Sequence, residues 1–188
     1  INSGVCYIGE NRVQEFLSKY DQYAPSHRHF IGHLQTNKVR TLLPLVYMIH
    51  SVDSLHLLET INREAAKIQR RVKVLLEVHV AQETTKSGFI PDELLSLANS
   101  LVASSPDPLY PWVEICGIMG MATNTDDQQE WRRCFREIKA LSHSLPMQGE
   151  SERDTIVSMG MSDDYPLAIE KGSTLIRIGS KIFGERHY

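Results

Sequence analysis

The sequence predicts an α/β fold built on parallel strands, and within that class a (β/α)8 barrel. Short apolar runs alternate with helical patterns along the whole chain, the runs are rich in Val and Ile, and most of them end in Gly or Ser. Hydrophobic residues make up 41% and charged residues 23% of the 188 residues, as in a folded domain. We therefore expect a single domain over residues 1–188.

Seven apolar runs have the length and composition of buried strands. They are Val5–Gly9, His29–Gly32, Met48–Val52, Lys73–Val80, Val113–Gly120, Thr155–Gly160 and Thr174–Gly179. A complete barrel has one strand more and about 250 residues. The chain also starts at Ile1 without an initiator methionine. We therefore expect the barrel to lack its first βα unit, so that the domain is truncated at its N-terminus.

Three segments between these runs have the 3.6-residue periodicity of helices that cover a sheet. The first follows a cap at Asp53 or Ser54 and places on one face Leu55, Leu58, Ile61, Ala65 and Ile68. The second extends from about Pro91 to Ser104, with acidic residues in its first turn. The third has on one face Trp131, Phe135, Ile138, Leu141 and Leu145.

Two patterns favour a barrel over an open doubly wound sheet. No G-x-G-x-x-G motif follows the first strand, so a dinucleotide site has no support. In the run from Val72 to Val80, one face is all Val and Leu while the other ends in Glu77 and His79. A barrel strand has this pattern when one face meets helices and the other points inward near the C-terminal rim.

Composition excludes several function classes. The net charge is −3, so the basic surface of a nucleic-acid-binding protein is not expected. No apolar run reaches the roughly 20 residues that span a membrane. The three cysteines, Cys6, Cys116 and Cys134, are widely spaced in apolar surroundings, which predicts buried thiols in the reducing cytoplasm.

The ends of the last two predicted strands are typical of a phosphate site. Ser158 lies at the end of one, and Gly179-Ser180 follows the other and opens a short final helix. Loops after the seventh and eighth strands of such barrels often bind phosphate. Alternation in the last strand turns Arg177 inward, where a guanidinium needs an acceptor. An ion pair with Glu77 and a hydrogen bond to a bound ligand explain Arg177 equally well.

Six ordered motifs give the chain a family resemblance. They are Gly9-Glu10-Asn11-Arg12-Val13-Gln14-Glu15, His29-Phe30-Ile31-Gly32-His33-Leu34-Gln35-Thr36-Asn37-Lys38, Ile49-His50-Ser51-Val52-Asp53, Thr85-Lys86-Ser87-Gly88, Ser158-Met159-Gly160-Met161-Ser162-Asp163-Asp164 and Ile176-Arg177-Ile178-Gly179-Ser180-Lys181-Ile182-Phe183-Gly184. On these motifs the chain resembles the pyridoxal-phosphate homeostasis proteins, which are single-domain barrels similar to the N-terminal domain of alanine racemase.

The resemblance implies a site for pyridoxal 5′-phosphate (PLP) at the strand ends. It implies that the phosphate is held by Ser158, Gly179 and Ser180. Arg177 would face the pyridine nitrogen, while Asn11 and His33 would line the ring. Met119 and Met159 flank glycines at the strand ends, and each either packs inside the barrel or contacts the ring. The family's Schiff-base lysine lies upstream of the Gly9-Glu10-Asn11 motif, so we expect it to be absent from this chain.

The resulting hypothesis is a cytoplasmic, monomeric protein of vitamin B6 homeostasis that buffers PLP or delivers it to PLP-dependent apoenzymes, without turnover. The alternative is a PLP-dependent racemase-like enzyme, which needs two opposed acid–base groups and takes one from a second, β-rich domain. A lyase that uses a barrel lysine would need an inward lysine at a strand end, and none is found. His27, His29 and His33 invite a metal site, but His27 and His29 are expected before the strand, at the bottom of the barrel. His50 and His79 on other strands do not complete a set of three ligands, so no metal is expected.

Overall fold

The computed structural model describes residues 5–23, 27–83, 87–104, 108–146 and 155–184. Its elements are β1 (Tyr7–Glu10), α1 (Val13–Ser18), the 3₁₀ helix η1 (Tyr20–Tyr23), β2 (His27–Phe30), α2 (Thr36–Leu42), β3 (Met48–Val52), α3 (Leu55–Lys67), β4 (Val72–Val78), α4 (Pro91–Ala103), β5 (Val113–Gly120), α5 (Gln128–Ser142), β6 (Ile156–Ser158), α6 (Tyr165–Glu170) and α7 (Ser180–Phe183). The first residue, Ile1, and the motif residue Lys86 lie outside the described residues.

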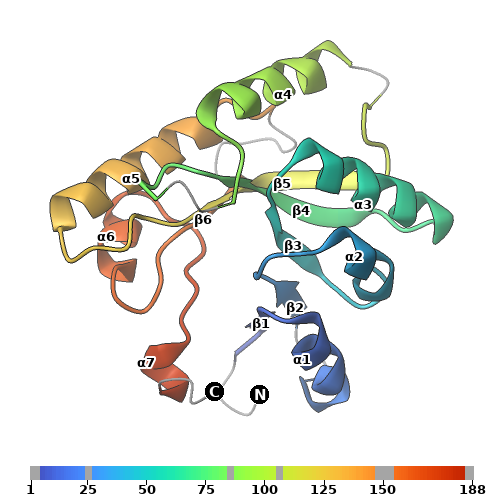
Figure 1. The fold of residues 1–188 in the computed structure, drawn as a ribbon, viewed down its shortest axis with the longest axis horizontal. Coiled ribbons are helices and arrows are strands. Elements are labelled where there is room, and N and C mark those ends of the chain that lie inside the picture. Colours follow the sequence, from blue (N-terminus) through green and yellow to red (C-terminus); the bar gives the residue numbers. More distant parts are fainter. Residues whose placement is uncertain (1–4, 24–26, 84–86, 105–107, 147–154, 185–188) are drawn as a thin grey trace.

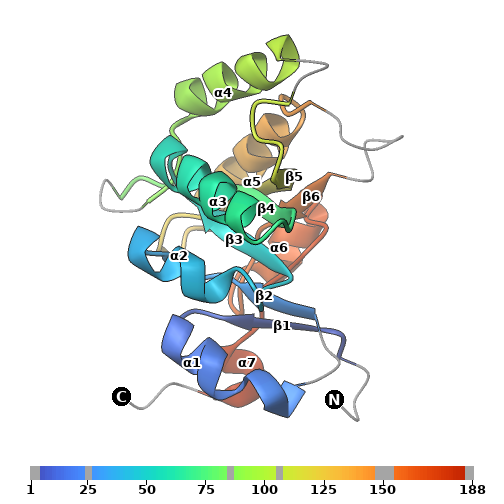
Figure 2. The same cartoon turned by 90° about the vertical axis from the view of Figure 1, so that its right-hand side faces the viewer.

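The strands form one parallel sheet whose order follows the chain, β1-β2-β3-β4-β5-β6. The sheet curves, and its helices lie around the outside, so the architecture is an α/β half-barrel (Figure 1). The view turned by 90° shows β1, α1 and α7 at one end of the molecule (Figure 2). The parallel α/β class is confirmed. The described residues form six of the seven expected strands.

The seventh expected strand, Thr174–Gly179, is extended but pairs too little to count as a strand. A single parallel bridge joins Leu175 to Ser158, and the Arg177 amide donates to the Gly160 carbonyl at 2.9 Å. This segment follows β6 on one side only, and its other side faces a cavity. A ladder needs a partner along its length, and β6 is only three residues long.

The observed strand ends differ from the expected ones where hydrogen-bond pairing with the neighbouring strand, rather than apolar content, sets the end of a strand. The strand expected at His29–Gly32 is β2 at His27–Phe30, because Tyr7 pairs with His27 and Glu10 with Phe30. Both His27 and His29 therefore lie within a strand rather than before it. The six strands predicted correctly in kind differ from the expected ranges by no more than a few residues at their ends.

The main core lies between the outer face of the sheet and the helices. Helix α3 begins as predicted, since the Ser54 hydroxyl accepts a hydrogen bond from the Leu57 amide at 3.3 Å. Its residues Leu58 and Ile61 are fully buried. The prediction was wrong for the two ends of this face, since Leu55, the first residue of the helix, and Ile68, which caps its last turn, are exposed.

A smaller apolar cluster lies on the inner face of the sheet, where alternate residues point away from the helices. Met48, Leu75 and Met119, from three adjacent strands, form it. Gly117 allows the close pairing of β5 with β6, because a Cβ there would lie 1.9 Å from the Ile156 carbonyl oxygen. Its φ of 150° is also one that few other residues adopt.

The cysteine prediction holds for one residue of three. Cys134 is buried and Cys116 is half-buried, but Cys6 is exposed just before β1, the edge strand of the sheet. No helix among the described residues has the length and apolar character required to span a membrane.

Candidate functional site

A cavity of about 510 Å³ lies between the two ends of the sheet. Its walls come from β1 and the residues after it, from the turn after β6, and from residues 175–184. Two buried imidazoles from the inner face, His29 and His50, also line it. The cavity thus joins the inner face of the half-barrel to loops that follow strand ends, where barrels of this class place their ligands.

Four of the seven predicted site residues line this cavity, and they come from two segments that are far apart in the sequence. They are Asn11, Arg177, Gly179 and Ser180. Asn11 follows β1, and its place depends on Gly32, where a Cβ would lie 2.1 Å from the Asn11 carbonyl oxygen. The absence of a side chain at Gly32 lets the ends of β1 and β2 approach each other.

The guanidinium of Arg177 occupies the inner wall. One nitrogen donates to the carbonyl and hydroxyl oxygens of Ser158, each at 2.9 Å, and the other donates to the Gly120 carbonyl at 3.1 Å. Burial lowers the pKa of Arg177 to about 10, against the opposing charges of Glu77 and Asp164. The group stays charged at neutral pH. Among the described residues it hydrogen-bonds to Ser158 and Gly120 and makes no ion pair with Glu77.

Ser158 does not lie where the sequence placed it. Its hydroxyl is fully buried and contacts Arg177 and His50, and Ser158 does not line the cavity. The reason is that Ser158 is the last residue of β6 and its side chain points to the inner face of the sheet, where His50 and Arg177 contact it. Met159, the next residue, points to the opposite face and is fully buried in the helix-side core. The neighbouring methionines Met121 and Met161 line the cavity instead.

Ser162 is the serine that lies beside Gly179, and the sequence analysis did not single it out. Its hydroxyl accepts from the amides of Gly179 at 3.3 Å and Lys181 at 3.4 Å. It is buried, and it lines the cavity together with Gly179 and Ser180. The signal was present, since the predicted strand ended at Gly160 and the following loop therefore begins with Met161-Ser162.

Two features shape the loop that carries Ser162. Gly160 has a φ of 93°, which turns the chain sharply after β6. The Asp164 carboxylate accepts a hydrogen bond from the Met161 amide at 2.6 Å. The turn is therefore closed by the chain's own groups, and Ser162 faces the start of α7.

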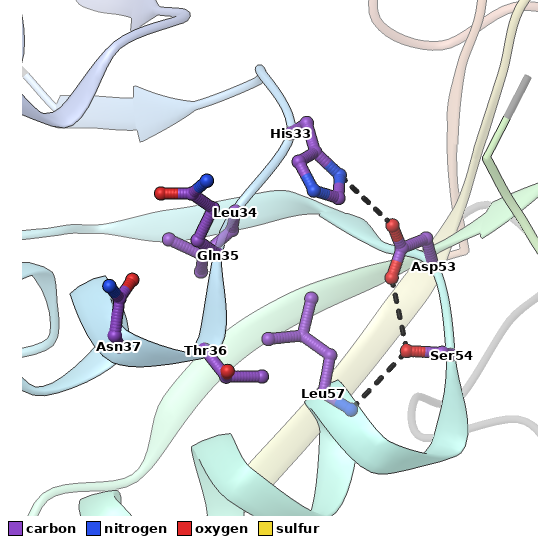
Figure 3. A pocket seen from close by; sticks show the side chains of 8 residues that line it. All are labelled: His33, Leu34, Gln35, Thr36, Asn37, Asp53, Ser54 and Leu57. Carbon is purple, nitrogen blue, oxygen red and sulfur yellow. Dashed lines mark hydrogen bonds and ion pairs between the residues drawn. The ribbon is translucent and has the colours of Figure 1, made fainter.

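His33 lies in a second, shallower pocket of about 470 Å³ at the ends of β2 and β3 (Figure 3). Its Nδ1 atom is 3.2 Å from an Asp53 carboxylate oxygen, and its side chain is 63% exposed. The other Asp53 oxygen accepts from the Ser54 hydroxyl, which caps α3. His33 is therefore engaged with Asp53 and does not line the cavity that holds Arg177.

Glu77 is the most perturbed carboxyl on the inner face. Burial, assisted by the nearby charge of Asp53, raises the pKa of Glu77 to about 7, although Arg177 opposes the shift. Within the described part of the chain, no group of three His, Cys, Asp or Glu side chains is arranged to hold a metal ion.

The fold and the cavity define a class of protein: a parallel α/β half-barrel with a small-molecule site between its first strand and its last loops, supplied with one fixed guanidinium. The family model described as "Alanine racemase, N-terminal domain" matches residues 1–187. The chain therefore belongs to the alanine racemase N-terminal domain family, and its similar curated relatives are pyridoxal phosphate homeostasis proteins.

The similarity to these relatives covers nearly all of this chain and about four-fifths of each relative. The pyridoxal phosphate homeostasis protein of Aquifex aeolicus is 39% identical over 189 residues, which cover 100% of this chain and 80% of the relative. That of Haemophilus influenzae is 33% identical over 191 residues, covering 99% and 78%.

Two solved structures describe the likeness in space. PipY of Synechococcus elongatus PCC7942, solved with PLP bound, has a TM-score of 0.83 and 33% identity, covering 97% of this chain and 84% of PipY. Alanine racemase of Clostridium difficile 630 has a TM-score of 0.77 at 14% identity, covering 100% of this chain and 47% of that one. The second likeness shows the fold alone.

Proposed function

We propose that this protein binds PLP in the cavity beside Arg177 and buffers or delivers it, without turnover of its own. The observation that carries the proposal is the meeting of Arg177, Asn11 and the Ser162–Gly179 pair around one cavity of about 510 Å³. The relatives' name and the PLP bound to PipY point to the same ligand. When bound, PLP supplies an aldehyde and an electron-withdrawing ring.

The phosphate end of the ligand would lie at the start of α7. The Ser162 hydroxyl already accepts from the Gly179 and Lys181 amides there, so those donors point at an oxygen acceptor. A Cβ built on Gly179 meets nothing within 4 Å, which leaves the backbone open to a ligand. Exposed backbone amides and small side chains are the groups that hold phosphate in such loops. Gly179, Ser180 and Ser162 are the residues we assign to this end.

The ring end would lie against Arg177. A permanently charged guanidinium beside the pyridine nitrogen keeps that nitrogen unprotonated and weakens the ring as an electron sink. This suits a carrier or a racemase-like site better than an aminotransferase. The alternative of a racemase-like enzyme has a likeness in fold alone, at 14% identity.

A further βα unit would close the barrel between β1 and residues 174–179. β1 is an end strand of the sheet, and the other end is the extended segment that bridges β6 through Leu175. Tyr7 in β1 is 55% exposed, and Phe183 in α7, which follows residues 174–179, is 85% exposed. Open edges and exposed aromatic rings are costly in a lone barrel domain. The unit that covers them would carry the lysine that attaches PLP.

The same proposal includes three finer points. Residues 1–188 belong to one domain, the protein is a cytoplasmic monomer, and its partners are PLP-dependent apoenzymes rather than nucleic acid or membranes. The net charge of −3 supports the exclusion of nucleic acid.

The test is a PLP titration of the full-length protein, followed by absorbance, with inorganic phosphate as competitor. We expect saturation at one PLP per chain and competition by phosphate. Delivery is measured by mixing the loaded protein with a PLP-dependent apoenzyme and following the recovery of that enzyme's activity. Absence of saturable binding would overturn the proposal, and racemisation of an added amino acid would favour the enzyme alternative.

A further inference from the structure

Four side chains on the inner face of the half-barrel form a continuous line of hydrogen bonds. Arg177 donates to the Ser158 hydroxyl at 2.9 Å, that hydroxyl lies 3.1 Å from His50 Nδ1, and His50 Nε2 lies 2.7 Å from His29 Nδ1. These residues come from residues 174–179, β6, β3 and β2, so the line crosses the barrel interior. Ser158 and His50 are at most 1% exposed and His29 is 5% exposed.

The direction of each hydrogen bond follows from the arginine. A guanidinium only donates, so the Ser158 oxygen accepts and its own hydrogen is available to His50 Nδ1. His50 then carries its hydrogen on Nε2 and donates to His29 Nδ1. His29 in turn carries its hydrogen on Nε2, which is buried beside the rings of Tyr7 and Tyr47 and has no hydrogen-bond partner among the described residues.

The opposite direction leaves more groups unpaired. If His50 donated from Nδ1 to Ser158, the serine hydrogen would have no acceptor among the described residues, and the His29 Nε2 lone pair would also be unpaired. Two unpaired buried groups cost more than one. The line therefore runs one way, from Arg177 to His29.

Both imidazoles must be neutral for the line to exist, since a doubly protonated ring has no acceptor nitrogen. Burial, with the neighbouring His27, lowers the pKa of His29 to about 4. Burial, with His29 and Arg177, holds the pKa of His50 well below its ordinary value. The line is thus intact throughout the neutral range.

We propose that Ser158, His50 and His29 are positioning residues, which hold the Arg177 guanidinium in the cavity wall through this one-way line. The proposal rests on the function proposed above. Without the line, Arg177 keeps only carbonyl acceptors, from Ser158 and Gly120, and the charge of Glu77 pulls it off the ring end of the ligand.

The first test needs no ligand, so its failure is distinguishable from failure of PLP binding. Nitrogen-15 NMR of the imidazoles in the full-length protein reports which ring nitrogen carries the hydrogen. We expect the Nε2–H tautomer for both His29 and His50, unchanged between pH 5.5 and 8. A Nδ1–H tautomer at His50, or titration of either ring near pH 6.5, would overturn the proposal.

The second test compares variants in the full-length protein loaded with PLP. His50→Leu and Ser158→Ala remove the line, whereas His50→Asn keeps an acceptor near the place of Nδ1. We expect the first two to weaken PLP binding about tenfold, the effect of one net hydrogen bond, and to shift the pH midpoint of the bound ligand's absorbance. His50→Asn should restore most of both.

Matched controls separate positioning from packing. Ser142→Ala removes another buried serine hydroxyl, one that bonds only to a helix carbonyl, and His56→Gln changes an exposed imidazole. Both should leave the PLP spectrum unchanged. If His50→Asn behaves like His50→Leu, or if neither variant changes the spectrum, then His50 and Ser158 contribute packing alone and the positioning role is wrong. Should His50→Leu fail to fold, the tautomers observed in the wild type decide the question.

Discussion

One nitrogen of Arg177 donates to two oxygens of the same residue, the carbonyl and the hydroxyl of Ser158, both at 2.9 Å. Ser158 is fully buried, so these acceptors are shielded from water. A charged donor shared between two shielded acceptors is held more firmly than a surface ion pair. The contact between Arg177 and Ser158 therefore fixes the position of the positive charge in the cavity wall.

Arg177→Ala should change the spectrum of bound PLP more than it changes affinity for phosphate. The guanidinium addresses the ring end, while Ser162 and Gly179 lie at the other end of the proposed site. We expect a shifted absorbance maximum for bound PLP. The inhibition constant for inorganic phosphate should stay within about threefold of wild type, so its binding free energy should change by less than roughly 0.7 kcal/mol.

Arg63→Ala, at an exposed position of α3, is the control for the loss of one positive charge. If Arg177→Ala weakens phosphate competition as strongly as it alters the spectrum, then Arg177 binds the phosphate and our assignment of the two ends is reversed.

Gly179→Val should abolish most PLP binding without reducing stability. A Cβ at this position meets nothing within 4 Å, and the φ of −126° is accessible to other residues. The new side chain would instead occupy space beside the backbone amides that face the ligand. We expect binding to weaken at least about tenfold, the loss of one charge-assisted hydrogen bond, with an unchanged melting temperature.

Gly117→Ala is the contrasting control, because there a Cβ would lie 1.9 Å from the Ile156 carbonyl oxygen. That variant should lose roughly 1–3 kcal/mol of unfolding free energy. Equal stability losses in the two variants would mean that Gly179 serves the fold rather than the ligand.

Stability should fall on acidification through the buried His29. The pKa of His29 is about 4 in the folded protein and 6.5 as its ordinary value, so the unfolded chain binds more protons between these limits. The contribution is complete above pH 6.5 and is lost as the pH falls toward 4, at up to about 1.4 kcal/mol per pH unit.

Denaturant titrations between pH 4 and 7 measure this slope. His29→Asn keeps an acceptor for His50 but cannot titrate, so its slope should be smaller than that of the wild type. Equal slopes in the two proteins would show that His29 is protonated in the fold and is not the source of acid sensitivity.

Glu77 should act in the opposite direction. Its pKa is raised to about 7 in the fold from an ordinary 4.5, so the folded protein binds the extra proton. The unfolding free energy therefore falls as the pH rises from 4.5 to 7, by roughly 3 kcal/mol at most. Glu77→Gln, which stays neutral, should gain stability relative to wild type across this window when both are melted at each pH. A constant difference would contradict the raised pKa.

Much of the fold could be predicted because local pattern carries it. Alternating apolar runs predicted seven parallel strands, six of which form, three helical faces predicted α3, α4 and α5, and Ser54 caps α3 as its side chain predicted. These features depend on residues a few positions apart, so a sequence read in order contains them. The burial of Cys6 and Ile68 was mispredicted because it depends on whether residues distant in the sequence pack against them, and both are exposed.

Four of the seven site residues predicted from the sequence line the cavity, and the errors for the other three share one cause. Ser158 is the last residue of β6 and Met159 follows it, so the two side chains point to opposite sides of the sheet, and neither lines the cavity. His33 has a suitable residue type at a suitable strand end, but its nearest carboxylate, Asp53, lies in a different pocket. Residue type and position after a strand do not say which cavity a side chain enters.

By itself, the sequence determined the class of fold, the family, and the inward turn of Arg177, because each follows from periodicity or from ordered motifs. Only the tertiary structure decided what Arg177 contacts, that Ser162 rather than Ser158 faces Gly179, and that His29 and His50 share a hydrogen bond. Hydrogen bonds on the inner face join residues that are far apart in the sequence, and His50 and Ser158, which share one of them, are 108 positions apart. They depend on the curvature of the sheet, which brings distant strands together across its inner face.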